Sequence, residues 1–131
     1  MKLPIAITLV AAFGLAAAHA ADLPPASTKT GVTFDADIKP IFMASCMPCH
    51  SSKGPKKPAG RLALDSLAAT IKGGRDGAVL KAGDSAHSDL VLSVAHVGDD
   101  PDSFMPKGKN AKMLKPEQIG LIRAWIDQGA K

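Results

Sequence analysis

Aromatic side chains are scarce in this sequence, at 4% of its 131 residues. Beyond the first twenty positions the aromatic residues are Phe34, Phe42, Phe104 and Trp125. Because aromatic rings supply much of the buried area of a typical core, the protein alone can build only a lean one. A large bound apolar group would help to fill that core. The length and a hydrophobic fraction of 46% suit a single domain better than two.

A large excess of one charge sign is also lacking. Lysine and arginine together number 16, against 12 aspartate and glutamate residues, which gives a formal net charge of +4. This mild excess is far from the dense positive surface that nucleic-acid binding requires, and no nucleic-acid-binding motif is present. We therefore expect no nucleic-acid partner.

No hydrophobic run is long enough to favour a membrane-spanning helix. The main apolar run covers residues 3–17, and it is short and rich in alanine. It follows Lys2 and precedes Ala18-His19-Ala20, an arrangement typical of a secretory signal peptide over residues 1–20. An uncleaved anchor is the alternative, and the lack of a cysteine near the cleavage point argues against a lipid anchor. We expect export to the periplasm, with no stable membrane insertion after cleavage.

Residues 21–32 carry few side chains that a core would bury. Proline, serine, threonine and glycine dominate this stretch, a composition that predicts a flexible leader. Ordered structure is expected to begin near Thr33, so that the single domain covers residues 33–131.

Alternation of apolar and polar residues, the mark of a half-buried strand, is not sustained anywhere in the chain. The expected fold class is therefore all-α, with about four helices and long loops. Capping residues, prolines and glycines place these helices at 35 or 37 to 46, 66–72, 85 or 88 to 98, and 115–129. Their expected apolar faces are Ile38, Ile41 and Phe42; Leu67 and Ile71; Leu90, Val91 and Val94; and Ile119, Ile122, Trp125 and Ile126.

Both cysteines of the chain lie in Cys46-Met47-Pro48-Cys49-His50, the pattern of covalent haem attachment. Two thiols separated by two residues lie on one side of a helical turn, where they can add to the two vinyl groups on one edge of a porphyrin. His50 then lies beneath the iron as its proximal ligand. The motif predicts one covalently bound haem c.

Two other interpretations of these residues must be weighed. In an oxidising compartment Cys46 and Cys49 could form a catalytic or structural disulfide, and proline precedes the second cysteine of some thiol oxidoreductases. In thiol oxidoreductases this motif lies next to a strand of a βαβ unit, and the hydrophobic pattern of this sequence indicates no such unit. A zinc site is disfavoured because the two cysteines and His50 are too close together in sequence and no second ligand pair follows.

Met105 is the candidate for the sixth iron ligand. It lies in Phe104-Met105-Pro106, in a loop between the third and fourth expected helices, and a thioether there would raise the reduction potential. The alternatives are that Met105 only fills the core, or that His96 or His87 binds the iron instead.

An iron held by two protein ligands in an apolar pocket suits single-electron transfer, which requires little nuclear rearrangement. We therefore expect an electron carrier and not an enzyme. A haem enzyme or gas sensor with a labile sixth ligand is an alternative, in which His96 with Asp99 or Asp100 would act as acid or base. A thiol–disulfide oxidoreductase is another. Periodicity suggests that the ring is buried by Ile41, Leu62, Leu64, Leu90, Val94 and Ile122.

Lysines gather on two loops that should flank the haem. They either form a positive ring that steers an acidic redox partner or simply keep the loops solvated, and the donor and acceptor are not identified by the sequence. These lysines are Lys53, Lys56 and Lys57 after the attachment motif, and Lys107, Lys109, Lys112 and Lys115 after Met105.

The order of these motifs resembles the class I cytochrome c superfamily. More narrowly, residues 34–130 are similar to the planctomycete-type cytochrome C domain. The residues that carry the likeness are Asp37-Ile38-x-Pro40-Ile41-Phe42, Cys46-x-x-Cys49-His50, Arg61-Leu62-x-Leu64-Asp65, Lys81-x-Gly83-Asp84, Met105-Pro106, Leu114-x-Pro116-Glu117 and Trp125-Ile126 before Gly129-Ala130.

This resemblance implies haem c on Cys46 and Cys49, with His50 proximal and Met105 distal. It also implies that the first helix crosses the last near Phe42 and Trp125. The chain departs from the family at one point, because Lys107 follows Met105-Pro106 where the family often has a second proline.

Overall fold

A computed structural model describes residues 22–131, so the signal peptide expected over residues 1–20 lies outside the described part. The described chain is helical and has no strand, which confirms the all-α fold class. No helix within residues 22–131 is long and apolar enough to cross a membrane. In chain order the elements are the π-helical turn η2 (Phe34–Ile38), α1 (Lys39–Ser45), α2 (Met47–His50), the 3-10 turn η3 (Ala59–Arg61), α3 (Leu67–Lys72), the 3-10 turn η4 (Ser85–His87), α4 (Asp89–Ala95), the 3-10 turn η5 (Pro101–Ser103) and α5 (Pro116–Asp127).

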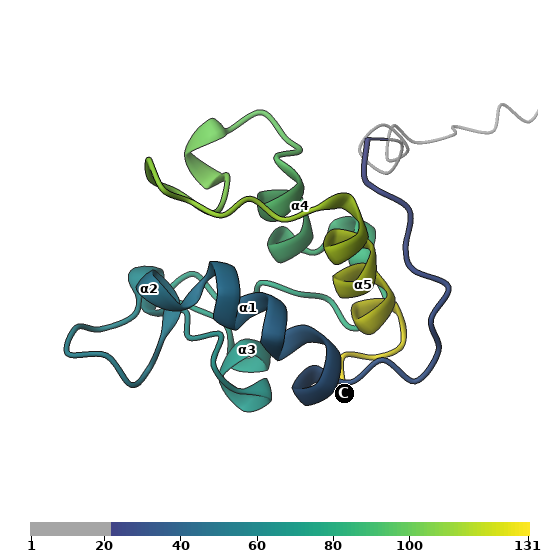
Figure 1. Cartoon of the computed structure of the whole chain (residues 1–131), viewed down its shortest axis with the longest axis horizontal. Helices are drawn as coiled ribbons and strands as arrows, with labels where there is room; N and C mark the ends of the chain where they lie inside the picture. Colours follow the sequence, from purple (N-terminus) through teal and green to yellow (C-terminus); the bar gives the residue numbers. More distant parts are fainter. Residues whose placement is uncertain (1–21) are drawn as a thin grey trace, which may run out of the picture.

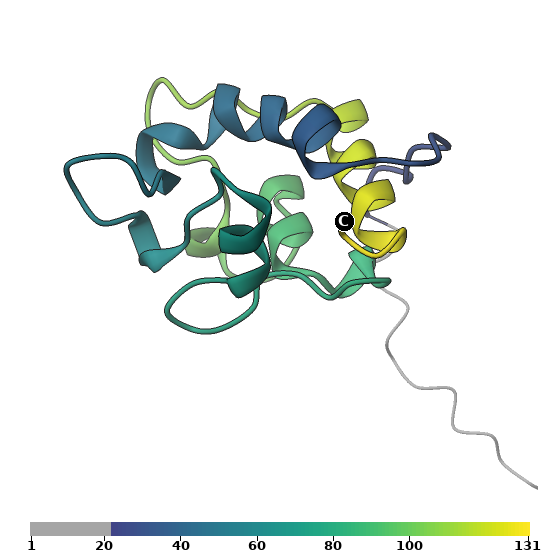
Figure 2. The same ribbon diagram turned by 90° about the horizontal axis from the view of Figure 1, so that it is seen from below.

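The first helical stretch begins at Phe34 with a widened turn. Pro40 has no N–H and cannot bond to the carbonyl four residues before it. The turn that leads into it is π-helical, with the Lys39 N–H bonded to the carbonyl of Phe34. The stretch from η2 to α2 runs along one edge of the molecule, with α5 at one end of it (Figures 1 and 2).

Helix α3 begins and ends at residues that the sequence marks, whereas α4 ends at Ala95, three residues before the expected Gly98, because His96 adopts the left-handed conformation. The Ser66 hydroxyl accepts a hydrogen bond from the Ala69 N–H at 3.2 Å, and Gly73 ends α3 with φ 80°. The expected apolar face of α3 is wrong at Ile71, which is 42% exposed, whereas Thr70 is buried. Thr70 can be buried because its hydroxyl donates to the Ser66 carbonyl at 2.8 Å.

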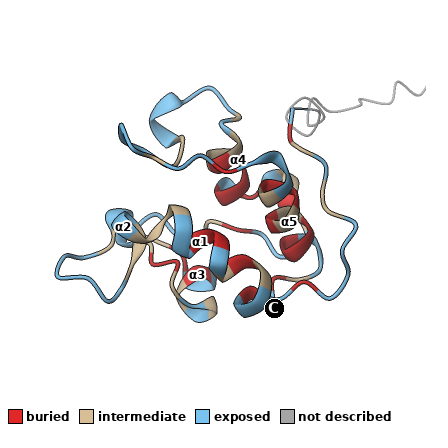
Figure 3. Ribbon diagram, in the orientation of Figure 1, coloured by how far each residue is buried: buried red, intermediate tan, exposed pale blue. Residues whose placement is uncertain are grey.

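Helix α5 provides the main wall of the core. Pro116 occupies its first turn, and Ile119, Ile122, Trp125 and Ile126 are buried as the periodicity predicts. The ring of Phe34 lies between two other rings, with its centroid 5.8 Å from that of Trp125 and 6.1 Å from that of Phe42. The first and last helical stretches therefore meet through η2, and α4 packs on α5; Figure 3 shows buried faces on α1, α4 and α5.

The segment 22–32, here called the strap, differs from the expected leader. Leu23 and Val32 are buried, and the strap runs beside α5 (Figure 1). The Ser27 N–H donates to the Gly120 carbonyl at 2.9 Å, and the Gln128 amide donates to the Lys29 carbonyl at 2.8 Å. The expectation that this stretch buries little is wrong because α5 supplies both an apolar surface and backbone partners for it.

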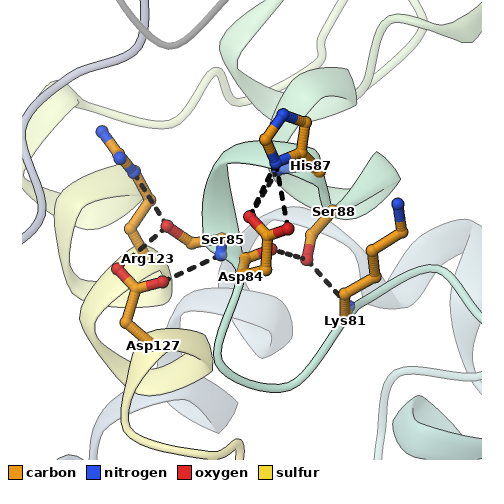
Figure 4. A network of polar contacts seen from close by, with 7 residues as sticks. All are labelled: Lys81, Asp84, Ser85, His87, Ser88, Arg123 and Asp127. Carbon is orange, nitrogen blue, oxygen red and sulfur yellow. Dashed lines mark hydrogen bonds and ion pairs between the residues drawn. The ribbon is translucent and has the colours of Figure 1, made fainter. Parts of the chain in front are cut away.

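A partly buried polar network joins η4 to α5 (Figure 4). The carboxylate of Asp127 accepts hydrogen bonds from the N–H and the hydroxyl of Ser85, at 2.8 and 3.0 Å. Arg123 donates from Nε to the same hydroxyl at 3.1 Å and from Nη1 to the carbonyl of Pro24 in the strap. Because η4 leads directly into α4, this network sets the position of α4 against α5.

Candidate haem-binding site

A cavity of about 510 Å³ lies between α2, α4 and the loop that precedes α5. All four sequence-predicted site residues line it: Cys46, Cys49, His50 and Met105. Its volume is within the range of pockets that hold cofactor-sized ligands. The rest of its wall is mainly apolar and includes Leu62, Leu64, Val79, Leu90, Val94 and Leu114.

Four of the six side chains expected to bury the ring therefore line the cavity, and Ile41 and Ile122 do not. Both isoleucines are buried in the core instead. Helix α1 contributes its last residues, Ala44 and Ser45, to the cavity wall. Helical periodicity identified the apolar face of each helix but could not divide that face between the core and the cavity.

The two thiols lie in the turn that joins α1 to α2. The N–H groups of Cys49 and His50 both bond to the carbonyl of Cys46, at 3.2 and 2.9 Å, and this turn brings the motif together on one wall. Burial raises the pKa of the Cys46 thiol to about 11, whereas the Cys49 side chain is exposed. Cys46 is therefore a protonated thiol at neutral pH.

His50 is held by a segment twelve to fourteen residues further along the chain. Its Nδ1 lies 2.9 Å from the carbonyl oxygen of Leu62, and the Leu64 N–H donates to the His50 carbonyl at 2.8 Å. A carbonyl only accepts, so Nδ1 carries the hydrogen and Nε2 keeps a free lone pair. This is the tautomer that a metal-binding imidazole requires, with its orientation set by the second nitrogen.

Asp65 extends the same support beyond His50, a contact that the sequence reasoning did not assign. Its Oδ2 accepts hydrogen bonds from the N–H and the hydroxyl of Ser52, both at 2.7 Å, and from the hydroxyl of Ser51 at 3.2 Å. The hydrogen bond from the Ser52 side chain is the main reason why the pKa of Asp65 lies below its ordinary value. The carboxylate thus ties down the turn that follows the histidine.

Met105 reaches the cavity from the long loop between α4 and α5. Its backbone N–H donates to the carbonyl of Ser93 in α4 at 3.0 Å, and its peptide bond to Pro106 is cis. Pro106, Lys107 and Gly108 line the cavity beside it. The loop therefore turns back over the cavity although Lys107 stands where a second proline is common in the family.

A smaller cavity of about 220 Å³ adjoins the first and shares His50 and Met105 in its lining. It brings in Arg75, which the sequence reasoning did not single out, together with the glycines of the 74–77 turn. Arg75 lies outside every helix, and no periodicity marks it. Its contact with the site depends on the hydrogen bond from its backbone N–H to the Gly60 carbonyl at 2.8 Å.

The other candidate iron ligands lie outside both cavities. His96 is exposed, and its Nε2 is 2.9 Å from the carbonyl oxygen of Met105. His87 is also exposed, and its Nδ1 is 2.8 Å from a carboxylate oxygen of Asp84 (Figure 4). The structure does not bring either histidine to the wall that His50 and Met105 share.

The residues of this site fit a haem c. Two thiols, one imidazole with a free Nε2 and one thioether are the donor set that covalent attachment and two axial ligands require. They line one apolar cavity, where burial disfavours water. Lys107 and Lys112 lie at the same wall, and such cations suit the two carboxylates that a haem carries.

Comparison with known proteins supports the same interpretation. No curated protein and no solved structure matches the chain. A family model described as Planctomycete cytochrome C matches residues 46–108, a segment that contains Cys46, Cys49, His50 and Met105. This match confirms the resemblance over residues 46–108, where the chain is similar to a planctomycete-type cytochrome C domain.

Proposed function

We propose that this protein is a periplasmic electron-transfer cytochrome that carries one haem c and passes single electrons between redox partners. Cys46 and Cys49 bind the haem covalently, and His50 and Met105 are the axial ligands of its iron. The observation that carries the proposal is the presence of all four side chains at one apolar cavity. A cytochrome C domain is a haem-binding module of electron transfer, and such domains are typically exported.

When bound, the haem supplies one-electron chemistry through its ferric and ferrous states. The protein orients the iron ligands and excludes water from the site. The Leu62 carbonyl orients the imidazole of His50, which leaves Nε2 as the donor atom. Leu64, Leu90 and Val94 exclude water from the site and so limit rearrangement when the charge on the site changes.

An acidic redox partner is the second part of the proposal. Lys107 and Lys112 line the cavity, and Lys109 and Lys115 lie on the same loop. Opposite charge steers the encounter of two proteins and raises the association rate. The surface beside the cavity therefore suits a partner with a negative docking face.

The proposal is tested with protein that is expressed together with haem-maturation machinery. We expect the haem to resist acid-acetone extraction and the mass to exceed that of the polypeptide by one haem. Extraction of all haem, or a mass equal to the bare polypeptide, would contradict covalent attachment. Cys46→Ala with Cys49→Ala serves as the control that must lose attachment.

The ligand assignment has its own test. Met105→Ala should lose the weak near-infrared sulfur-to-iron band of the ferric protein, because no thioether remains at the iron. Met113→Ala is the matched control, since Met113 is on the same loop and 49% exposed. If the band persists in Met105→Ala and disappears in Met113→Ala, the ligand is the other methionine.

A haem enzyme or gas sensor is the first alternative. It needs an open sixth position and a distal acid or base, and His96, Asp99 and Asp100 are outside the cavity lining. Carbon monoxide binding by the reduced native protein discriminates between the two functions. We expect no binding without denaturant, and rapid binding would favour the alternative.

A thiol–disulfide oxidoreductase is the second alternative. Its first cysteine must be a reactive thiolate, whereas burial raises the pKa of Cys46 to about 11. A colourless protein whose two thiols react readily with a thiol reagent would favour this function over electron transfer.

A further inference from the structure

Met105 lies on a loop of twenty residues between Ala95 at the end of α4 and Pro116 at the start of α5. The short turn η5 is the only helical element inside this loop. A ligand on such a loop stays at the iron only if other contacts fix its backbone. Met105 has two such contacts, since its N–H bonds to the Ser93 carbonyl at 3.0 Å and its carbonyl lies 2.9 Å from Nε2 of His96.

His96 is itself held in a specific place. It is the residue at which α4 ends, with φ 56° and ψ 43° in the left-handed region, and its N–H bonds to the Ser93 carbonyl at 3.3 Å. Its ring is stacked on Phe104, with centroids 4.9 Å apart and planes 9° from parallel. The ring therefore connects the end of α4 to Phe104 and Met105 at once.

The identity of residue 96 is unusual for its backbone. A left-handed residue at a helix end is most often glycine, because a Cβ makes this conformation less favourable, and non-glycine residues adopt it uncommonly. A non-glycine residue in this uncommon conformation beside a site points to a role for its side chain. Here the side chain donates a hydrogen bond from Nε2, which the Met105 carbonyl accepts.

We propose that His96 is a positioning residue, which holds the Met105 thioether at the iron by fixing the backbone of Met105. This rests on the proposed function, in which Met105 is the distal ligand. Without the His96 contact, only the hydrogen bond to Ser93 would hold Met105, and the thioether would leave the iron more often.

The test measures how easily an added ligand displaces the thioether from ferric holoprotein. His96→Gly removes the ring, with both its hydrogen bond to Met105 and its stacking on Phe104, and glycine suits the left-handed backbone. We expect imidazole to bind His96→Gly about five to ten times more tightly than it binds wild type. The loss of one hydrogen bond corresponds to a change in affinity of this size. His87→Ala removes an exposed histidine outside the cavities and should bind imidazole as wild type does.

The same substitution in the Met105→Ala background shows whether His96 acts through Met105. No thioether remains to be displaced there, so adding His96→Gly should leave the imidazole affinity unchanged. An equal gain in affinity in both backgrounds would overturn the proposal, because His96 would then affect the pocket itself. Wild-type affinity in the single His96→Gly variant would also overturn it.

Two further comparisons separate a failure of the Met105 assignment from a failure of the His96 proposal. If the near-infrared band is unaffected by Met105→Ala, the ligand assignment fails, whatever His96 does. If His96→Gly does not incorporate haem, His96→Asn takes its place, since asparagine tolerates the left-handed backbone and its amide nitrogen ends one bond short of the Nε2 position. The asparagine variant is expected to show the same gain in imidazole affinity.

Discussion

At the scale of single residues, the site depends on side chains that never reach the cavity. Asp65 is such a residue, since its carboxylate binds Ser51 and Ser52, which directly follow His50 in the chain. Its second oxygen, Oδ1, is buried and has no hydrogen-bond partner within the described residues. The hydrogen bonds of this carboxylate are all made by Oδ2, and they weaken when the charge of Asp65 is removed.

Asp65→Asn should lower the free energy of unfolding at pH 7 by about 1–2 kcal/mol, because the hydrogen bonds that Oδ2 accepts lose the negative charge that strengthens them. Hydrogen bonding to Ser52 lowers the pKa of Asp65 below the ordinary value of 3.8. A lowered pKa stabilises the fold fully above 3.8, and this contribution is lost as the pH falls through the folded value. The difference between wild type and variant should therefore shrink below pH 4.

Denaturant unfolding of the holoprotein at several pH values between 3 and 7 measures this difference. Asp99→Asn is the control, since Asp99 is exposed and should behave as wild type throughout. A difference between wild type and Asp65→Asn that stays constant down to pH 3 would show that the carboxylate charge is not what stabilises the turn.

At the scale of elements, the strap and α5 depend on one glycine. A Cβ at Gly120 would lie 2.6 Å from the backbone carbonyl oxygen of Pro25. The Gly120 carbonyl also accepts the hydrogen bond from Ser27. Alanine is the better helix former, so a loss of stability at this position would report the clash with the strap alone.

Gly120→Ala should destabilise the protein by about 1–3 kcal/mol and release the strap, because a backbone carbonyl cannot move aside as a side chain can. Limited digestion with trypsin should then cut after Lys29 much faster than in wild type. Gly54→Ala is the matched control, since its Cβ would lie 3.9 Å from the nearest atom, the carbonyl oxygen of Lys56. Equal digestion of Gly120→Ala and wild type would mean that the strap does not need this close approach.

Helices α3 and α5 are the elements that sequence reasoning placed best. Ser66, Gly73 and Pro116 are local signals whose physical effect depends on a few neighbouring residues. The error at Ile71 and Thr70 is of another kind. Their exposure is decided by what packs on α3, and the periodicity of a six-residue helix does not contain that information.

At the scale of the whole molecule, Lys107 and Lys112 border the cavity. Lys112→Glu should slow oxidation of the ferrous protein by ferricyanide several-fold at low ionic strength, because the oxidant is an anion. The rates of variant and wild type should converge near 0.15 M salt, where the screening length is about 8 Å. Stopped-flow absorbance follows the reaction directly.

Lys72→Glu is the control for this experiment. It changes the net charge by the same amount at an exposed position that does not line the cavity. An equal effect of both substitutions would show that ferricyanide responds to total charge and not to the lysines beside the cavity. The proposed docking face would then lose its support.

The sequence by itself determined which donor groups share the site, because Cys46, Cys49 and His50 occupy one turn and their spacing alone brings two thiols and an imidazole together. It also determined the helices whose caps and apolar stripes are local. Only the tertiary structure decided which apolar residues face the cavity, that the strap packs on α5, and that Arg75 and His96 lie beside the site. Those contacts join residues from separate segments, and their partners are set by the packing of the whole chain.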